Sequence, residues 1–474
     1  MMRLNDLLAA VGVFCTDETP IHTITTHHQD AALGVLFVAL VGYRFDSHCE
    51  IPSVLRAGAA VLGSVKEDHV YYVPDTKSVL PHLAEAFYGY PHQFVKMIGV
   101  TGTNGKSSVT NFIASLLRKM HKRVCLIGGD GIFLEERYLP TSNTTPSALE
   151  LSGILATCIA EEVEYVVMEV SSHAIEQGRV SALYYDALIF LNLGHDHLDY
   201  HPSFYQYKES KMKLLQQLKP QGHVLVNGDD RELLSILEEG TIPVALFGRN
   251  QAQYRIANPV TTAASSSFTL AYEMQAQRIT LSLLSIVNIY NVSAAIAVLH
   301  QLGFSFTDLC ILASSLRPMA GRLEVVINEP FTVLIDYAHT VEAFQTLGAF
   351  IQSCAAQRKC IVMGLGGNRD QAKRPLIGAL LHQYFDVLIY TSDNPREEDP
   401  QAIIDDLCQL TGFERVLVEI DRKTAIERAI KMAGNGDIIV IAGRGNEAYQ
   451  WIGSQKIPFQ DKQVVMQALK LLDS

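Results

Sequence analysis

A glycine-containing turn offers the clearest chemistry in the sequence. Residues 99–108 read Gly-Val-Thr-Gly-Thr-Asn-Gly-Lys-Ser-Ser. The phosphate-binding pattern G-x-x-x-x-G-K-S/T would need Gly at position 100, where this chain has Val, so the turn is a variant of that pattern. Its backbone N–H groups and a helix N-terminus would form an anion cradle, with Lys106 reaching terminal phosphates and the Ser107 hydroxyl binding Mg²⁺. The structural alternative is a tight strand–helix turn with a chance Gly-Lys-Ser.

Three further side chains could act with this turn, although each has an ordinary structural explanation. Glu169 follows an apolar run, where a carboxylate would suit Mg²⁺; the alternative is a surface glutamate at a strand end. His197 lies in the segment His-Asp-His-Leu-Asp-Tyr-His (195–201), which taken alone favours a polar loop. Lys211 is one of three lysines within residues 208–213, a pattern typical of a solvated helix face.

Alternating strands and helices are expected to position these residues. A strand over 95–100 precedes the turn, and an amphipathic helix from Ser107 to about Lys119 follows it. Short apolar runs predict further strands at 124–127, 165–168, 187–191 and 223–226. Helical patterns lie between several of these runs, which favours a mostly parallel sheet.

The flanking parts of the chain predict two more α/β units. The N-terminal part contains an apolar strand at 35–41, a helix at 51–59 and a short strand at 60–64. The C-terminal part contains predicted strands at 332–335, 360–363, 387–390, 416–419 and 437–441. Clusters of Gly and Asp or Asn follow several of these strands, at 364–369, 393–396 and 443–447. Ligands bind at the carboxyl ends of strands in open α/β sheets. We expect domains at 1–92, 93–320 and 321–474.

Composition excludes several classes of protein. The 474 residues are 48% hydrophobic and 19% charged, unlike disordered, collagen-like or low-complexity chains. A net charge of −12 argues against general nucleic-acid binding. No apolar run approaches the ~20 residues of a membrane-spanning helix. The scattered cysteines, with no Cys-x-x-Cys pair and no secretory signal, predict a cytoplasmic protein with reduced thiols and no zinc. No segment marks an interface, so we expect a monomer.

Further motifs follow the turn in a characteristic order. They are Asn-Thr-Thr-Pro (143–146), Met-Glu-Val-Ser-Ser-His (168–173), Gln-Gly-Arg (177–179), Leu-Asn-Leu-Gly-His-Asp-His (191–197), Gly-Arg-Leu-Glu (321–324), Asp-Tyr-Ala-His-Thr (336–340) and Asp-Asn-Pro-Arg (393–396). With the variant turn, this set resembles the Mur ligase family, the ATP-dependent amide ligases of peptidoglycan precursor synthesis. The resemblance covers the chain well from about residue 95 and loosely before it. Within the family it is strongest to the ligases that add the third amino acid to UDP-N-acetylmuramoyl-L-alanyl-D-glutamate.

The resemblance implies a three-domain α/β fold and a set of site residues. A small N-terminal domain would hold the UDP part of the acceptor, a central P-loop parallel-sheet domain ATP, and a Rossmann-like C-terminal domain the amino acid. The implied catalytic residues are Lys106, Glu169, His197 and Lys211, with Ser107, Glu169, His197 and Lys211 binding Mg²⁺. In the family the lysine matching Lys211 carries a carbamate formed with CO₂, which needs an unprotonated amine.

The substrate-binding residues are implied in the same way. The ATP-binding set is Gly102, Thr103, Asn104, Gly105, Lys106, Ser107, Ser108, Asn288, Asn291, Arg322 and Asp336. The acceptor-binding set is Asn143, Thr144, Thr145, Ser171, Gln177 and Arg179. The amino-acid set is Arg369, Asp393, Asn394, Pro395, Arg396, Gly443 and Glu447. The two asparagines at 288 and 291, with Arg322 and Asp336, could instead be turn or salt-bridge residues.

The identity of the amino acid depends on the Asp-Asn-Pro-Arg segment. In the family, Arg at its last position accompanies meso-diaminopimelate. Diaminopimelate has a second carboxylate where lysine has none, and the Arg396 fork can pair with a carboxylate bidentately. Glu447 suits the distal ammonium. The alternative is an Asn-Pro turn with a solvent-facing arginine.

Two segments depart from the family pattern. The family usually has Gly-Lys-Gly-His-Glu where this chain has Gly-Arg-Gly-Asn-Glu (443–447), and an Asp-Ser-Arg segment where it has His-His-Gln (27–29). The most favoured function is ATP-dependent addition of meso-diaminopimelate to the muramoyl dipeptide through an acyl phosphate. The alternatives are a family paralogue joining a different acid and amine, a P-loop ATPase or kinase and, least favoured, a nucleotide-binding scaffold without activity.

Overall fold

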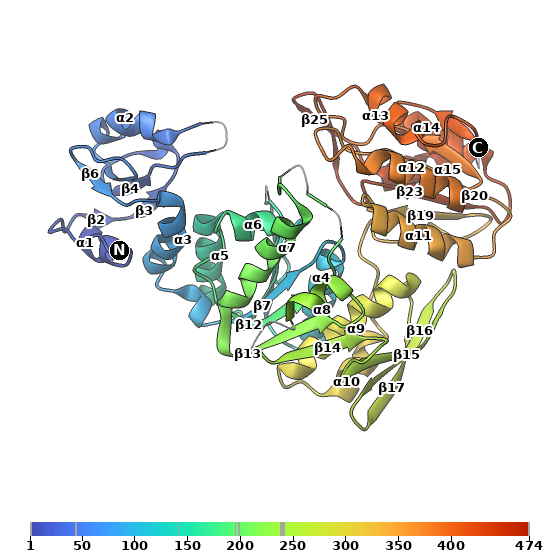
Figure 1. The fold of residues 1–474 in the computed structure, drawn as a ribbon, viewed down its shortest axis with the longest axis horizontal. Coiled ribbons are helices and arrows are strands. Elements are labelled where there is room, and N and C mark those ends of the chain that lie inside the picture. Colours follow the sequence, from blue (N-terminus) through green and yellow to red (C-terminus); the bar gives the residue numbers. More distant parts are fainter. Residues whose placement is uncertain are drawn as a thin grey trace.

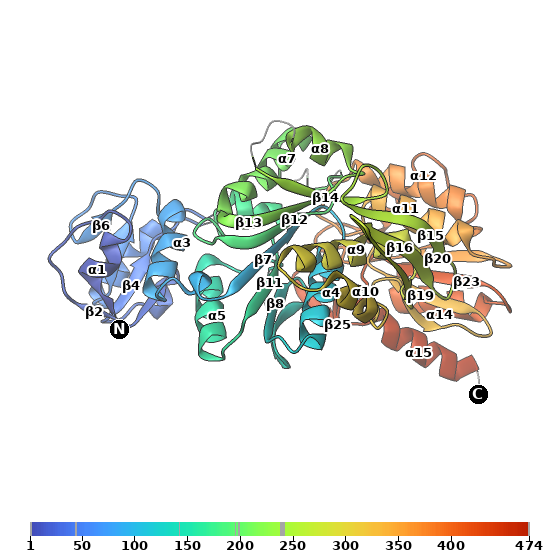
Figure 2. The ribbon, with the colours of Figure 1, turned by 90° about the horizontal axis from the view of Figure 1, so that it is seen from below.

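Three sheets of four or more strands follow one another along the described chain, each covered by helices (Figure 1). The computed structural model describes residues 2–42, 45–141, 143–194, 196–197, 200–237 and 242–472. The N-terminal and C-terminal parts lie on opposite sides of the central part, as Figures 1 and 2 both show. Within the described ranges, no helix has the length and apolar character to cross a membrane.

The N-terminal sheet has four parallel strands. Its order is β3 (Thr23–Thr25), β4 (Val35–Val38), β5 (Ala60–Gly63) and β6 (Val70–Tyr72), with helices α1 (Leu4–Ala9), α2 (Ile51–Arg56) and α3 (Thr76–Phe87). A short antiparallel pair, β1 (Met2–Arg3) and β2 (Pro20–Ile21), precedes it. Every residue of β4 is buried, as its unbroken apolar run predicts.

A buried polar network joins this part to the central one. The Glu85 carboxylate on α3 lies 2.5 Å from Nδ1 of His92 and accepts a 2.7 Å hydrogen bond from Ser152 on α5 (Ala148–Ala160). Because all three side chains are buried, breaking one contact would leave polar groups without water or a partner. The network therefore fixes α3 against the central part.

The central sheet has eleven strands, parallel in the middle and antiparallel at both ends. Its order is β10 (Arg137–Leu139), β9 (Gly131–Leu134), β8 (Val124–Gly128), β11 (Tyr165–Glu169), β7 (Lys96–Thr101), β12 (Tyr185–Phe190), β13 (Leu218–Asn227), β14 (Val244–Gly248), β15 (Tyr254–Thr261), β16 (Ser266–Tyr272) and β17 (Gln275–Leu281). The strands from β8 to β15 pair in parallel, and β9–β10 and β15–β17 add antiparallel edges. The expected parallel sheet is thus extended by hairpins.

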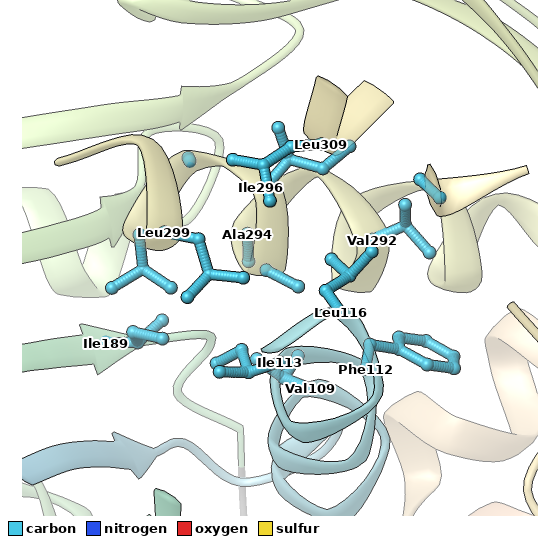
Figure 3. Close-up of a cluster of buried hydrophobic side chains, with 14 of the residues drawn as sticks. Val109, Phe112, Ile113, Leu116, Ile189, Val292, Ala294, Ile296, Leu299 and Leu309 are labelled. Atoms are coloured by element: carbon cyan, nitrogen blue, oxygen red, sulfur yellow. The ribbon is translucent and has the colours of Figure 1, made fainter. Parts of the chain in front are cut away.

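Packing on one face of this sheet fixes the start of the helix after the turn. That helix, α4 (Lys106–Lys119), buries Val109, Ile113 and Leu116 at helical spacing against α9 (Ser285–Gln301), as Figure 3 shows. Helix α10 (Phe306–Ala313) joins the same cluster. Burial of each such aliphatic side chain stabilises the fold by about 1.5–3 kcal/mol. The opposite face carries α5, α6 (Ser172–Glu176) and α7 (Phe204–Met212).

The C-terminal sheet has six strands, all parallel except the first. Its order is β18 (Glu324–Ile327), β19 (Thr332–Asp336), β23 (Ile438–Ala442), β20 (Lys359–Met363), β21 (Val387–Tyr390) and β22 (Val416–Val418). Its helices are α11 (Val341–Ser353), α12 (Lys373–Tyr384), α13 (Pro400–Cys408), α14 (Arg422–Met432) and α15 (Asp461–Leu472), and a hairpin of β24 (Tyr449–Ile452) and β25 (Gln455–Pro458) adjoins it.

Candidate active site

A cavity of about 930 Å³ lies where the central and C-terminal sheets face each other. Its wall includes the segments that follow β7, β11 and β12 in the central sheet. The opposite wall includes the segments that follow β19, β20, β21 and β23 in the C-terminal sheet. Both sheets therefore present the carboxyl ends of their parallel strands to one space, where α/β proteins bind their ligands.

The glycine-containing turn is held in shape by a neighbouring loop. Gly102 and Gly105 both have positive φ, at 153° and 88°, which glycine adopts without steric cost. The Asn192 side chain accepts a hydrogen bond from the Asn104 N–H (2.8 Å) and donates one to the Asn104 carbonyl (2.9 Å). This pairing keeps the turn open at the N-terminus of α4, where an anion can meet the backbone N–H groups.

Lys106 folds back over the turn that precedes it. Its Nζ donates to the carbonyl oxygens of Gly102 (2.8 Å) and Thr103 (2.9 Å). Burial lowers the pKa of Lys106, although the negative charges of Glu169 and Asp196 oppose that effect. The lysine nitrogen thus lies against the turn itself, and its contact with terminal phosphates stays a prediction.

Glu169 is buried at the end of β11, so the alternative of a surface glutamate is wrong. The residue is 3% exposed, and its carboxylate accepts a 3.0 Å hydrogen bond from the Gly129 N–H. Burial raises its pKa, while the nearby Lys106 opposes the rise. A buried carboxylate between a backbone donor and a lysine fits the binding of a cation beside phosphates.

Lys211 is also buried, whereas Lys213 is on the surface. Lys211 is 2% exposed, and its Nζ donates to the Gly102 carbonyl (3.1 Å) and lies 4.7 Å from the ring centre of Tyr207. Lys213 has a half-exposed side chain that pairs with Glu176. Burial, together with the positive charge of Lys106, holds the pKa of Lys211 well below its usual range. The solvated-face explanation therefore applies to Lys213 and fails for Lys211.

His197 faces the same cavity from the polar segment after β12. Its backbone has a positive φ of 56°, and its Nε2 lies 3.4 Å from the Asp196 carboxylate. Burial lowers the pKa of His197 to about 3, so the ring is neutral near pH 7. His195, Leu198 and Asp199 of this motif lie outside the described residues.

The four residues implied as metal ligands all reach one cavity, whose wall includes Ser107, Glu169, His197 and Lys211. The hydroxyl and the carboxylate are oxygen donors of the kind Mg²⁺ prefers, and nucleotide phosphates would supply more. In the described part of the chain, no three His, Cys, Asp or Glu side chains come together as a metal-ligand group. The residues therefore fit a cation shared with substrate oxygens better than a cation held by protein alone.

The C-terminal part contributes an arginine to the turn. Arg322 Nη2 donates a long 3.5 Å hydrogen bond to Ser107 Oγ, and its guanidinium lies 4.0 Å from the ring centre of Tyr337. The Asp336 carboxylate accepts from two backbone N–H groups, both at 2.8 Å, and burial raises its pKa. On α9, Asn291 packs so closely on the turn that a Cβ at Gly105 would lie 2.9 Å from its oxygen. Asn288 lines the cavity beside it.

Contacts across the cavity include residues that the sequence analysis missed. The Asp196 carboxylate lies 3.8 Å from Nζ of Lys373 and 3.9 Å from Nε2 of His339. Burial favours the neutral acid, but His197, His339 and Lys373 outweigh it and lower the pKa of Asp196. Asp196 was visible in the sequence only as a neighbour of His197, and no local pattern predicts its partners.

The segment 393–396, which follows β21, contributes Asp393, Asn394 and Arg396 to the wall of the cavity. Asn394 Nδ2 donates to Glu447 Oε2 (2.7 Å), and Arg396 Nη1 donates to the Gly367 carbonyl (2.5 Å). The Arg396 guanidinium lies 5.4 Å from the ring centre of Trp451 and the residue is partly buried, so it is not the fully solvent-facing arginine of the alternative. Burial, then the charge of Asp393, raises the pKa of Glu447.

Backbone packs directly on backbone in these loops. A Cβ on Gly364 would overlap the Thr391 carbonyl oxygen, and a Cβ on Gly367 would overlap that of Pro395. The loops after β20 and β21 therefore touch without intervening side chains. Arg369 and Arg396 both emerge from this pair of loops and line the cavity.

Most of the predicted site residues line the cavity, but five do not. The predicted residues that do not line it are Gly102, Thr145, Gln177, Arg179 and Pro395. Arg179 donates to the Thr145 carbonyl (2.9 Å) and to the Gln177 side chain (2.9 Å), so these three support one another. Asn143, Thr144 and Ser171 of the acceptor set do line the cavity.

Comparison with known proteins gives one consistent result. The sequence matches the Mur ligase middle domain over residues 100–299 and the Mur ligase glutamate ligase domain over residues 321–445. It is 36% identical over 454 residues to the UDP-N-acetylmuramoyl-L-alanyl-D-glutamate–2,6-diaminopimelate ligase of Geobacillus kaustophilus, covering 93% of each chain. It is 34% identical over 477 residues to the ligase of that name from Listeria monocytogenes serotype 4b, covering 97% of each.

Solved structures agree on the fold. A structure of a UDP-N-acetylmuramoyl-L-alanyl-D-glutamate–2,6-diaminopimelate ligase superposes with a TM-score of 0.71 at 28% identity and covers 100% of both chains. MurF from Thermotoga maritima in complex with ADP gives a TM-score of 0.66 at 18% identity, covering 96% of this chain and 97% of that one. At that identity the second likeness shows the fold alone.

Proposed function

The chain belongs to the Mur ligase family of ATP-dependent, amide-forming ligases, and from that premise we propose that it adds meso-diaminopimelate to UDP-N-acetylmuramoyl-L-alanyl-D-glutamate. The single observation that carries the proposal is which residues line the two walls of one cavity. The Lys106 turn lies on one wall, and Arg369, Arg396 and Glu447 lie on the other. A nucleotide and a diamino dicarboxylic acid would thus meet in one space.

The charges at the far end of the cavity match the distal end of diaminopimelate. That end carries an ammonium and a carboxylate, whereas lysine carries only the ammonium. Glu447 offers a carboxylate for the ammonium, and Arg369 and Arg396 offer guanidinium groups for the carboxylate. The relatives named above for a 2,6-diaminopimelate ligase activity support this choice over lysine.

The reaction has two steps. The D-glutamyl carboxylate of the acceptor attacks the γ-phosphorus of ATP, the bond to the β,γ-bridging oxygen breaks, and an acyl phosphate and ADP form. The amine of diaminopimelate then attacks the acyl carbon, and phosphate leaves as the amide forms and the nitrogen loses a proton. Lys106 and Arg322 neutralise the phosphate charges during the first step, in which positioning and electrostatics do most of the work.

Mg²⁺ is proposed to lie between these phosphates and the protein. Glu169 and Ser107 would hold it by oxygen atoms, where it would supply charge neutralisation. His197 and Lys211 are proposed as ligands of a second ion. Lys211 gains an oxygen donor only as a carbamate, and its low pKa supports that modification because the neutral amine is the form that attacks CO₂. The other residues of the ATP-binding, acceptor-binding and amino-acid sets given in the sequence analysis are proposed to bind those three substrates.

The proposal is tested by ADP release from the purified protein with Mg²⁺, ATP and the muramoyl dipeptide. We expect turnover with meso-diaminopimelate and little with L-lysine. Equal turnover with both amines would refute the assigned role of Arg396. Turnover without any amine would favour an ATPase or kinase.

A family paralogue with other substrates is the second candidate. It is favoured by His27, His28 and Gln29, which replace the family's Asp-Ser-Arg segment in the predicted UDP-binding domain. Protein that binds ATP but turns over with neither amine would support this candidate. A screen of other carboxylic acids and amines would then identify its substrates.

A further inference from the structure

Arg444 is a buried arginine directly behind the amino-acid end of the cavity. It is 0% exposed and does not line the cavity, although Gly443, Asn446 and Glu447 around it do. It is also one of the two positions at which segment 443–447 departs from the family pattern. A buried charge needs a specific set of partners, so its contacts indicate what it does.

The guanidinium holds two segments at once. Nη1 donates to Asn394 Oδ1 (2.8 Å), and Nη2 donates to the Tyr449 carbonyl. The same Nη1 lies 3.7 Å from Glu447 Oε2, and the guanidinium carbon lies 5.4 Å from the Phe459 ring centre. Among the described residues, its Nε has no hydrogen-bond partner. A buried donor without a partner costs free energy. The position of Arg444 is therefore explained by the hydrogen bonds that its other nitrogens donate to neighbouring residues.

These contacts determine which way the Asn394 amide faces. Its Oδ1 accepts from Arg444 and also from the Trp451 N–H (2.8 Å), while its Nδ2 donates to Glu447 Oε2. If the amide turned over, its oxygen would face the Glu447 carboxylate, and its NH₂ would face two donors. Arg444 supplies one of the two donors that prevent this rotation.

We propose that Arg444 is a positioning residue of the amino-acid site, which fixes Asn394 so that its amide orients the Glu447 carboxylate toward the distal ammonium of the diamino acid. The proposal rests on the proposed function, because it takes Glu447 as the group that receives that ammonium. Arg444 itself touches neither substrate nor ATP.

In this chain, a lysine at position 444 would not make the same pair of contacts. The planar guanidinium reaches the Asn394 oxygen and the Tyr449 carbonyl through different nitrogens held in one plane. A lysine ammonium is a single point on a flexible chain. Arg444→Lys therefore keeps the charge and most of the volume but loses the fixed geometry, which makes it the decisive variant.

The test compares Arg444→Lys with Arg358→Lys. Arg358 also pairs with a carboxylate, that of Asp437, but it precedes β20, at the end of the strand remote from the cavity. Both proteins are checked by melting temperature and ADP binding, and KM is measured for diaminopimelate, ATP and the dipeptide. We expect Arg444→Lys to raise KM for diaminopimelate about tenfold, the effect of losing a hydrogen bond to a charged group. The other two KM values and the control should stay within about twofold.

A double-mutant cycle with Glu447→Gln separates positioning from general damage to the fold. If Arg444 acts through the Glu447 carboxylate, Arg444→Lys should change KM for diaminopimelate by less than about twofold once Glu447 is Gln. An undiminished increase in that background, or no increase in the single variant, would overturn the proposal. Wild-type turnover with a different amine would refute the proposed substrate instead, and the same cycle run with that amine would still decide the role of Arg444.

Discussion

Lys211→Met removes a buried amine while keeping a side chain of similar length. The amine makes one hydrogen bond, to the Gly102 carbonyl, worth about 0.5–1.5 kcal/mol. Its low pKa adds a larger pH-dependent effect. Below the usual lysine pKa of about 10.4, the unfolded chain binds a proton that the folded protein excludes. The free energy of unfolding then rises with pH by up to about 1.4 kcal/mol per unit, between the lowered folded pKa and the unfolded one.

Two measurements follow from this reasoning. In CO₂-depleted buffer without Mg²⁺, urea unfolding across pH 7–9 should show a steeper rise in stability for the wild type than for Lys211→Met. ADP release under assay conditions should be abolished in the variant and, in CO₂-depleted wild type, restored by bicarbonate. Lys213→Met, which loses only a half-exposed ion pair, should match the wild type in both assays.

The unfolding measurement and the turnover measurement each test a different part of this prediction. Equal pH slopes for the wild type and Lys211→Met would show that the buried amine is not neutral in the folded protein. Full turnover by the variant would show that no carbamate on Lys211 is needed. The expected outcome is a variant that is folded and inactive, and whose stability rises less steeply with pH than that of the wild type.

Three further substitutions give separate predictions. Arg396→Met should raise KM for diaminopimelate about tenfold or more, because a charged pair is lost, and leave any turnover with L-lysine unchanged; an equal effect on both amines would contradict it. Asp196→Asn removes the carboxylate facing Lys373 and His339, so small-angle scattering should give a larger radius of gyration for the ligand-free protein; an unchanged radius would show that these contacts do not hold the two parts together. Gly367→Ala should lower stability by about 1–3 kcal/mol in urea unfolding, because the added methyl overlaps a carbonyl of the next loop; unchanged stability would mean that the loops move apart freely.

The sequence predicts strands well where apolar runs are unbroken. The run at 387–390 forms β21 with the expected bounds, and 332–335 is extended only by Asp336, which pairs with Ala442. By contrast, β13 begins at Leu218, five residues before the predicted strand, because Leu218 also pairs with Tyr185 across an irregularity in the register. The antiparallel edge at 254–281 was not predicted, since its half-exposed strands mix Ser, Thr and Gln with apolar residues.

The sequence predicts site residues that directly follow an apolar strand. It does not predict site residues that are brought to the cavity only by tertiary packing. Lys106 and Glu169 both follow apolar runs, and both reach the cavity. Lys211 lies in the last turn of α7 and Lys213 begins the short 3₁₀ helix that follows, but only the tertiary structure shows which of the two is buried. The pairing of Asp196 with Lys373 joins residues far apart in the chain, and no local pattern encodes it.

The direct backbone packing around Gly364 and Gly367 limits how this protein can change. Neither position can accept a side chain without moving the loop beside it, so both should be intolerant in a saturation library. The backbone framework of the proposed amino-acid site is therefore closed to gradual variation. If the proposal holds, new amine preferences come from the side chains that project from that framework, such as Arg369, Arg396 and Glu447. Selection for a different substrate would be expected to enrich changes at these positions and leave the glycines untouched.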